Sequence, residues 1–257
     1  MRDVLFLPFA DGMELAVAAD GSAAVGDKPG DVVSAPADVV AYFAARVALM
    51  ELVSVGAEAK AVVLQNFIAD DRWEALCRGV RRTCRELGID LPITGSTESN
   101  FPTVQSVLGV TAIGTVANER KRIGITPEEA KFAVIGRPLV GSAVLSHPEW
   151  VAPLPLFAAL LRTPYIYELI PIGSKGIYYE WTQLLAANGR QGRACACPLP
   201  LFSSGGPATS VLVSYDPDGE REIKKQAGSL FFHCTSSGKS RLLLAKNHFL
   251  FRSDPLS

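Results

Sequence analysis

A nearly uniform apolar stretch between residues 36 and 55 constrains the fold more than any other part of the chain. It follows Ser34-Ala-Pro36, and after Asp38 its only charged residues are Arg46 and Glu51. A serine cap, a proline in the first turn and an acid near the positive end of the dipole are helix-start signals. The pattern therefore predicts a helix, and a helix that is apolar on all sides must be buried on more than one side.

Glu51 is the exceptional residue of this predicted helix. It lies in the last turns, where the helix dipole disfavours an anion. A largely buried carboxylate needs a partner. Two alternatives follow, an ion pair with an arginine or service as a ligand of a cation.

The segment Asp20-Gly-Ser-Ala-Ala-Val-Gly-Asp-Lys-Pro-Gly-Asp31 precedes the helix and combines three carboxylates, three glycines and one lysine. Glycines let the backbone approach a ligand closely, and carboxylates hold hard cations. Lys28 between two acids indicates an anionic partner such as a phosphate. The alternative is an acidic surface turn. The ligand hypothesis assigns Asp20, Asp27 and Glu51 to Mg²⁺ and Lys28 to the phosphates of a nucleotide.

The rest of the chain alternates between strand-like and helix-like patterns, which predicts an α+β protein. The predicted strands are 4–9, 13–19, 59–67, 104–116, 132–136, 165–171, 193–198 and 208–214, and the further helices are 70–87, 153–161 and 176–187. The charged segment 118–124 is the best boundary between domains. We therefore expect domains at 1–118 and 124–257, with an atypical tail after about residue 215.

Two further polar segments have compositions suited to anions. Gly95-Ser-Thr-Glu-Ser-Asn100 follows Ile93-Thr94 and is expected to form a loop with exposed amides, hydroxyls and a carboxylate. Ser174-Lys-Gly176 stands at the start of a predicted helix, where free amides and the positive dipole end attract anions. A plain polar loop and ordinary helix capping are the alternatives.

Composition excludes several classes of function. The 257-residue chain has a net charge of −1 and no basic stripe, which disfavours nucleic-acid binding. The N-terminal residues lack the long apolar segment of a signal peptide, so none is expected, and no apolar run is long enough to predict a membrane span. Five cysteines without a C-x-x-C pair favour a reducing, cytoplasmic location. Ser237-Gly-Lys-Ser240 is not a P-loop, because His233 stands where the first glycine is required.

The order of these motifs resembles the aminoimidazole ribonucleotide (AIR) synthetase superfamily, which includes thiamine-monophosphate kinase and selenophosphate synthetase. Asp20–Lys28 is similar to its Asp-Gly-Val-Gly-Thr-Lys loop, with three extra residues. Glu51-Leu-Val-Ser-Val-Gly-Ala57 resembles its Asp-hydrophobic-x-x-x-Gly-Ala helix end, with Glu in place of Asp. Gly95–Asn100, Pro171–Glu180 and Gly205–Val211 most closely resemble alpha-ribazole kinases.

The resemblance implies a two-domain fold whose N-terminal sheet pairs with a second copy, and whose C-terminal half is an α/β sandwich. It implies an ATP- and Mg²⁺-dependent kinase acting on a small nucleoside-like acceptor, alpha-ribazole, in cobalamin lower-ligand assembly. The carried-over metal ligands are Asp20, Asp27 and Glu51, with Glu98 as a further one. Lys28, Gly95, Ser96, Thr97 and Asn100 are expected to contact ATP, and Ser174, Lys175 and Gly176 the acceptor or the transferred phosphate.

Two alternatives stay open beside the kinase. One is another ATP-dependent enzyme of the same superfamily, although a selenophosphate-type activity is disfavoured because no cysteine precedes Cys77. The other is a dimeric nucleotide-binding module without turnover, which the atypical tail motivates.

Overall fold

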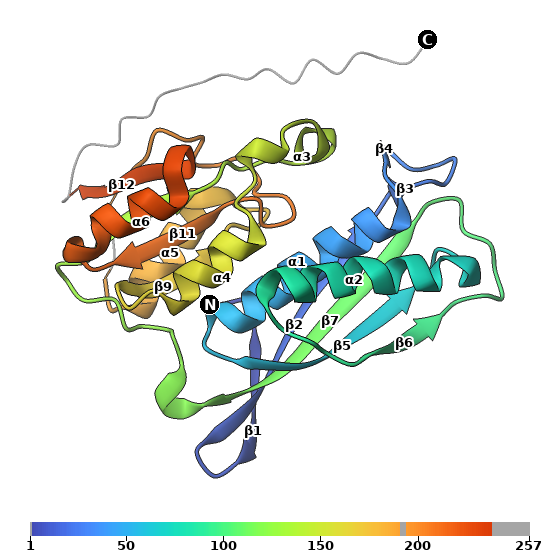
Figure 1. Cartoon of the computed structure of the whole chain (residues 1–257), viewed down its shortest axis with the longest axis horizontal. Coiled ribbons are helices and arrows are strands. Elements are labelled where there is room, and N and C mark those ends of the chain that lie inside the picture. Colours follow the sequence, from blue (N-terminus) through green and yellow to red (C-terminus); the bar gives the residue numbers. More distant parts are fainter. Residues whose placement is uncertain (1, 191–193, 238–257) are drawn as a thin grey trace.

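The computed structural model describes residues 2–190 and 194–237, which fold around two five-stranded sheets (Figure 1). The first sheet is built from the N-terminal part of the chain and the second from the C-terminal part. The expected α+β class with two sheets and covering helices is confirmed. From residue 238 on, the segment resembling the end of a P-loop lies outside the described residues, whereas residues 216–237 of the expected atypical tail are described.

The first sheet has the strand order β1-β2-β7-β5-β6. Its strands are β1 (Leu5–Ala10), β2 (Met13–Ala23), β5 (Glu58–Asn66), β6 (Ile93–Thr97) and β7 (Val107–Ala117). The β1–β2 hairpin is confirmed, with Leu5 opposite Val17. Strand β2 is longer than expected, so Asp20 belongs to a strand and not to a loop. A short parallel pair, β3 (Val25–Gly26) and β4 (Val33–Ser34), carries the chain on to the first helix.

The predicted Gly95–Asn100 loop is in part a strand. Ile93–Thr97 forms β6, which runs parallel to β5 with Gly95 beside Leu64. A Cβ atom at Gly95 would lie 2.1 Å from the Leu64 carbonyl oxygen, so only glycine fits there. Polarity suggested a loop, but this strand lies at the edge of the sheet, where polar side chains face water.

Two helices, α1 (Ala37–Ser54) and α2 (Trp73–Leu87), cover one face of the first sheet (Figure 1). The prediction that α1 is buried on more than one side is confirmed, because α2 and the second half of the chain pack around it. The expected Ser34 cap is wrong: Pro36 is the N-cap residue, without a side-chain cap bond, and Ser34 lies in β4. Gly88 closes α2 in the left-handed conformation, as its position predicts.

The second sheet is antiparallel, with the order β10-β12-β8-β11-β9. Its strands are β8 (Lys131–Ile135), β9 (Ile166–Pro171), β10 (Ala194–Ala196), β11 (Val211–Tyr215) and β12 (Phe231–Ser237). Its helices are α3 (Ser142–Ser146), α4 (Leu154–Arg162), α5 (Gly176–Ala187) and α6 (Glu220–Ala227). Short 3₁₀ turns lie at Asp70–Arg72, Asn118–Arg120, Pro148–Trp150, Pro217–Gly219 and Gly228–Leu230.

Alternation along the strands gives the second sheet two buried faces. On β8, Phe132 and Val134 belong to a cluster with Trp181 of α5, whereas Ala133 and Ile135 belong to the large core shared with α1. Helices α4 and α6 also contribute to the large core. That core therefore continues from one sheet to the other, and the domain boundary at 118–124 stays a prediction. No helix within residues 2–190 and 194–237 combines the length and apolarity that a membrane crossing requires.

Candidate functional site

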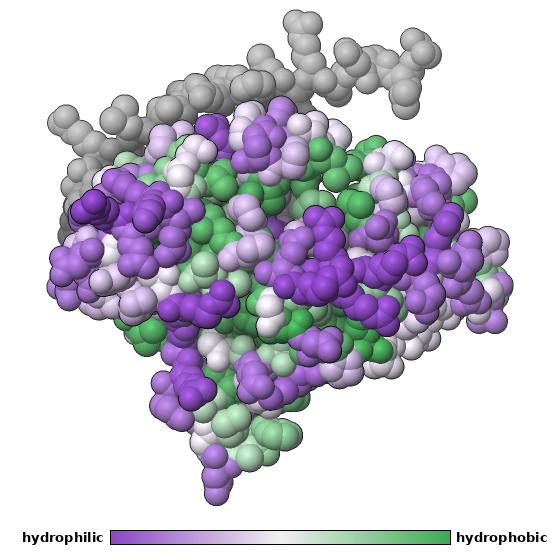
Figure 2. All heavy atoms as spheres, viewed as in Figure 1, coloured by the Kyte–Doolittle hydropathy of each residue, from purple (hydrophilic) through white to green (hydrophobic). Residues whose placement is uncertain are grey.

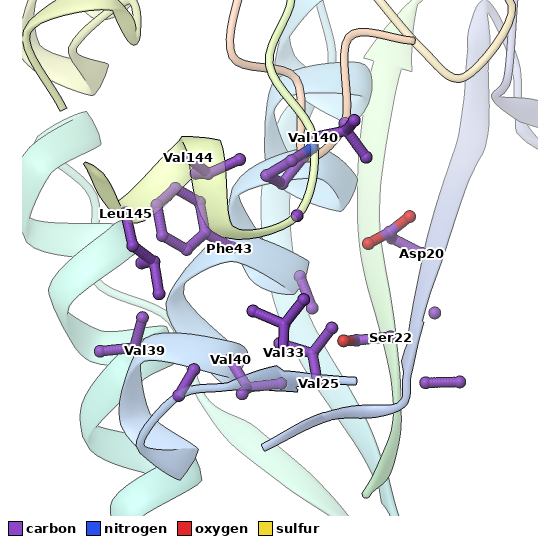
Figure 3. Close-up of a pocket in the computed structure, with 17 residues that line it drawn as sticks. Asp20, Ser22, Val25, Val33, Val39, Val40, Phe43, Val140, Val144 and Leu145 are labelled. Atoms are coloured by element: carbon purple, nitrogen blue, oxygen red, sulfur yellow. The ribbon is translucent and has the colours of Figure 1, made fainter. Parts of the chain in front are cut away.

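A cavity of about 260 Å³ lies where the C-terminal end of β2 and the first turns of α1 meet two loops of the second half (Figure 3). One wall carries Asp20 and Ser22 from β2. The facing wall is apolar and includes Val40, Phe43 and Val144. A ligand here would meet one carboxyl group and a broad apolar surface.

Glycine conformation shapes the far side of this cavity. Gly206 has a φ of +51°, and a Cβ atom there would lie 2.1 Å from the carbonyl oxygen of Leu139. The turn that contains Gly206 and Pro207 can therefore lie directly against the segment that leads to Val140. Gly206, Pro207 and Val140 all line the cavity.

Asp20 is the titratable side chain of the cavity wall. Burial raises its pKa to about 6, and a hydrogen bond from the backbone of Gly21 works in the opposite direction. Such a group exchanges protons near neutral pH more readily than an ordinary aspartate does. Of the metal ligands predicted from the sequence, Asp20 therefore lies in the cavity wall.

Glu51 does not line the cavity and belongs to a second group of buried charges. Its carboxyl Oε2 is 4.0 Å from Nη2 of Arg2, and the two side chains are 12% and 6% exposed. Burial raises the pKa of Glu51 to about 8; the charge of Arg2 lowers it, while Glu180 and Asp20 raise it. Both alternatives for Glu51, an ion pair and a cation ligand, therefore stay open. Arg2 lies beside its carboxyl group, and the charge of Asp20, another predicted ligand, acts on its pKa.

Glu180 of α5 joins this group and was missed in the sequence. Burial raises its pKa to about 7, with Arg2 again acting in the opposite direction. The sequence feature that could have indicated Glu180 is a single carboxylate among apolar residues of the predicted helix, such as Ile177 and Trp181. Arg2 itself gave no signal, because only the fold brings the chain start to α1 and β9, where it donates to the Leu169 carbonyl at 3.0 Å.

The carboxylates suit Mg²⁺ in type but do not form a complete cage. Within the described residues, no group of three or more His, Cys, Asp or Glu side chains is arranged to hold a metal ion. Mg²⁺ commonly takes only one or two protein carboxylates and completes its shell with water and substrate phosphates. Asp20 and Glu51 suit that limited role in residue type, and Arg2 beside Glu51 has buried Nε and Nη1 atoms without a hydrogen-bond partner.

Asp27 and Lys28 lie outside the cavity lining. Asp27 Oδ2 is 2.7 Å from Nη2 of Arg72, and both side chains are 41% exposed. The Lys28 ammonium donates to the Thr103 carbonyl at 3.1 Å and to the hydroxyl of the same residue. Asp31 organises this loop, because hydrogen bonds from Ser106 and Lys28 outweigh its burial and hold its pKa below the usual range.

The structure brings this loop close to the predicted phosphate segment through a chain of polar contacts. Thr103 Oγ1 donates to the Phe67 carbonyl at 2.9 Å, and Asn66 Nδ2 donates to Thr97 Oγ1 at 3.1 Å. The Glu98 carboxylate accepts from the Asn100 amide at 2.7 Å. Ser96 and Gly95 are exposed on β6. These candidates form one group at the edge of the first sheet, and none of them lines the cavity.

Ser174, Lys175 and Gly176 begin α5, with Lys175 as the N-cap residue. The Lys175 ammonium lies 4.3 Å from the centre of the Tyr179 ring. Gly176 has a φ of +80°, and a Cβ atom there would lie 2.7 Å from the Ser203 carbonyl oxygen. The start of α5 therefore packs against the same 201–207 turn whose last residues line the cavity.

The N-terminal part of the chain is similar to a known protein family. Residues 2–116 match the family described as AIR synthase related protein, N-terminal domain. Among curated proteins, none matches the chain.

Solved structures with the same fold extend the likeness beyond residue 116. A thiamine monophosphate kinase from Aquifex aeolicus is 13% identical, with a TM-score of 0.60 over 93% of this chain and 90% of its own. A chain of the HypE–HypF complex is 11% identical, with a TM-score of 0.60 over 90% of this chain and 87% of its own. PurL of T. maritima, complexed with ATP, is 12% identical, with a TM-score of 0.58 over 90% of this chain and 41% of its own. At these identities the likeness shows a shared fold over 90–93% of this chain.

Proposed function

We propose that this chain is an ATP- and Mg²⁺-dependent kinase that phosphorylates a hydroxyl group of a small nucleoside-like acceptor, with alpha-ribazole as the first candidate. The observation that carries the proposal is the cavity between the two halves, where Asp20 faces an apolar wall. The family match and the fold shared with a thiamine monophosphate kinase and with an ATP-bound protein support it.

The apolar wall suits a flat, weakly polar group such as a nucleobase or a benzimidazole ring. Val39, Val40 and Phe43 present aliphatic and aromatic surface, and Asp20 supplies the single charge. Small-molecule sites are mostly apolar, with a few placed polar groups that fix orientation. The 201–207 turn links this wall to Lys175, so one ligand could reach from the cavity to the start of α5.

In the proposed reaction, the acceptor oxygen bonds to the γ-phosphorus as the bond from that phosphorus to the β–γ bridging oxygen breaks. ADP leaves with the electron pair, and the hydroxyl proton passes to a base. Mg²⁺, when bound, would neutralise charge on the phosphate groups. Asp20 and Glu51 are the residues proposed to hold it, and Lys175 the residue proposed to stabilise the transferred group.

A second copy of the chain is the proposed partner of the first sheet. The strand register places Leu5, Val17 and Ile113 in one row across β1, β2 and β7. They point away from α1 and α2, because their strand neighbours Ala16, Ala18 and Ala112 form the helix-side core. Leu5 and Phe9 are 58% and 65% exposed, and the hairpin shows apolar surface above a hydrophilic tip (Figure 2). Such a surface is typical of an interface.

The decisive experiment is turnover with ATP, Mg²⁺ and alpha-ribazole. ADP release that depends on the acceptor, with a new phosphate monoester signal in ³¹P NMR, is the expected result. Asp20→Asn should abolish it, and Glu58→Gln, at an exposed position on β5, is the matched control. Binding of Mg²⁺-ATP without ADP release for any nucleoside would contradict the kinase and favour a nucleotide-binding module.

A further inference from the structure

Three thiols come together at one edge of the second sheet. In the antiparallel pairing of β10 with β12, Cys195 lies opposite Ser236 and Ala196 opposite Thr235. Cys197 directly follows β10, and continuing this register by one residue sets Cys197 opposite Cys234. All five cysteines carry free thiols, and Cys195 and Cys234 belong to the core cluster against which Cys197 packs.

Strand geometry favours a disulfide between Cys197 and Cys234 over one between Cys195 and Cys234. Residues directly opposite on antiparallel strands have Cα atoms about 4.5–5.5 Å apart, within the range of about 4.4–6.8 Å that a disulfide requires. Diagonal neighbours lie about 7–8 Å apart, beyond that range. Cys197 can therefore bond to Cys234, whereas Cys195, on the diagonal, cannot do so without backbone movement.

The chemistry of the two thiols is complementary. A side-chain hydrogen bond with Cys234 lowers the pKa of the Cys197 thiol, even though burial opposes the shift. Hydrogen bonds with Cys195 and Cys197, together with burial, raise the pKa of Cys234. Cys197 is also the more exposed of the three. It has the accessible, thiolate-prone character of an attacking cysteine, and Cys234 that of a buried resolving partner.

The cysteines of α2 provide a contrast within the same chain. Cys77 and Cys84 are buried, and burial raises the pKa of each thiol. Neither shares a strand pair with another cysteine. Ordinary core packing accounts for them.

We propose that Cys197 and Cys234 form a reversible disulfide, a redox site that does not depend on the kinase function. The Cys197 thiolate attacks one sulfur of a small disulfide such as glutathione disulfide, and a first thiol leaves with the proton of Cys197. Cys234 then attacks the Cys197 sulfur of the mixed disulfide, and a second thiol leaves with its proton. Two protein thiols and one small disulfide thus yield one protein disulfide and two small thiols.

The position of the bond connects it to the cavity. Cys197 immediately precedes segment 198–207, whose Leu201 carbonyl accepts from the Tyr178 amide at 2.8 Å in the first turn of α5. The same segment ends at Gly206 and Pro207 in the cavity wall. A bond from Cys197 to β12 therefore fixes the start of the segment that links α5 with the cavity.

The test uses the full chain, reduced and then incubated with glutathione disulfide, followed by alkylation and non-reducing peptide mapping. The expected result is loss of two of the five thiols and a single cross-linked pair that contains Cys197 and Cys234. Dithiothreitol should restore five thiols. Persistence of five free thiols in the folded chain under excess glutathione disulfide would overturn the proposal.

Matched variants decide the pairing. Cys195→Ser and Cys77→Ser should both keep the cross-link, while Cys197→Ser and Cys234→Ala should both lose it. Circular dichroism of each variant checks that it is folded, and Cys197→Ala serves as the second variant where the serine change disturbs the core. A cross-link that survives Cys197→Ser, or that disappears in Cys195→Ser, would contradict the assigned pair.

Discussion

Arg2 Nη2 lies 4.0 Å from Glu51 Oε2, so the first residues of the chain neutralise part of a buried carboxylate in the longest helix. The contact joins the N-terminus to the group that includes Glu180 and Asp20. Burial raises the pKa of all three carboxyl groups, to about 8 for Glu51, about 7 for Glu180 and about 6 for Asp20. This group should therefore dominate how stability depends on pH.

The first prediction concerns Glu51→Gln. Between the ordinary pKa of 4.5 and about 8, the folded chain keeps a proton on Glu51 that the unfolded chain releases. Unfolding then releases protons, so the free energy of unfolding should fall as pH rises through this window. Glu51→Gln should flatten that slope and be the more stable protein at pH 8. Urea titrations from pH 5 to 8 measure this, and parallel curves for the two proteins would exclude a raised pKa at Glu51.

The second prediction concerns Arg46, which is fully buried in α1 and holds the second half of the chain. Its Nη2 donates to the Ala152 and Ala208 carbonyls at 2.6 and 2.9 Å, and Nε to the Pro207 carbonyl at 3.2 Å. Arg46→Met would leave these carbonyls without donors, although it also relieves a buried charge. We expect a loss of about 2–4 kcal/mol in the free energy of unfolding.

Arg81→Met is the control for that loss, because Arg81 is exposed on α2. It should change the free energy of unfolding by less than about 0.5 kcal/mol. Similar values for the two substitutions in urea unfolding would show that the carbonyl contacts of Arg46 contribute little.

Local patterns in the sequence explain why much of the fold was predictable. The apolar run of α1, the three- and four-residue periodicity of α2 and the turn at Gly12 predicted their elements correctly, because neighbours in sequence decide these features. Strand β6 was missed, since its edge position depends on pairing with β5. Helix α6 was missed because it is short and mostly charged.

The candidate site was predictable only in part, for a related reason. Asp20 and Glu51 could be selected as acids in unusual settings, but their neighbours Arg2 and Glu180 come from distant parts of the chain. The pairing of Cys197 with Cys234 likewise depends on strand register. Contacts between residues far apart in the sequence cannot be predicted from local patterns, whereas the unusual residue types that make these contacts can be recognised in the sequence.

The third prediction separates a cation ligand from a surface ion pair. If Asp27 holds Mg²⁺ in the bound state, Asp27→Asn should abolish Mg²⁺-ATP binding, whereas Arg72→Gln, which frees the carboxylate, should preserve or strengthen it. Both should change the free energy of unfolding by less than about 1 kcal/mol, because the pair is exposed. Calorimetric titration measures the affinity. Equal losses in the two variants would assign Asp27 to structure alone.

The fourth prediction concerns the open face of the first sheet. Phe9→Glu and Leu5→Glu place charges on exposed positions of β1, so they should dissociate a dimer without unfolding the chain. Sedimentation equilibrium should report a dimer for the unaltered chain and a monomer for the variants. Val32→Glu, at a residue that is 82% exposed away from β1, is the control and should stay dimeric. A monomeric unaltered chain at micromolar concentration would contradict the interface.

The last prediction assigns Lys175 to the transferred group and not to nucleotide affinity. Lys175 caps α5, is exposed, and rests over the Tyr179 ring, so its ammonium can approach a phosphate without breaking an ion pair among the described residues. An interaction that forms mainly in the transition state raises kcat more than affinity. Lys175→Ala should therefore lower kcat by about 100-fold, the order of one charge-stabilising group, while the Kd for Mg²⁺-ATP changes by less than about threefold. Lys60→Ala, at another exposed lysine, should leave both unchanged. A large rise in the Kd with kcat preserved would instead place Lys175 in the nucleotide site.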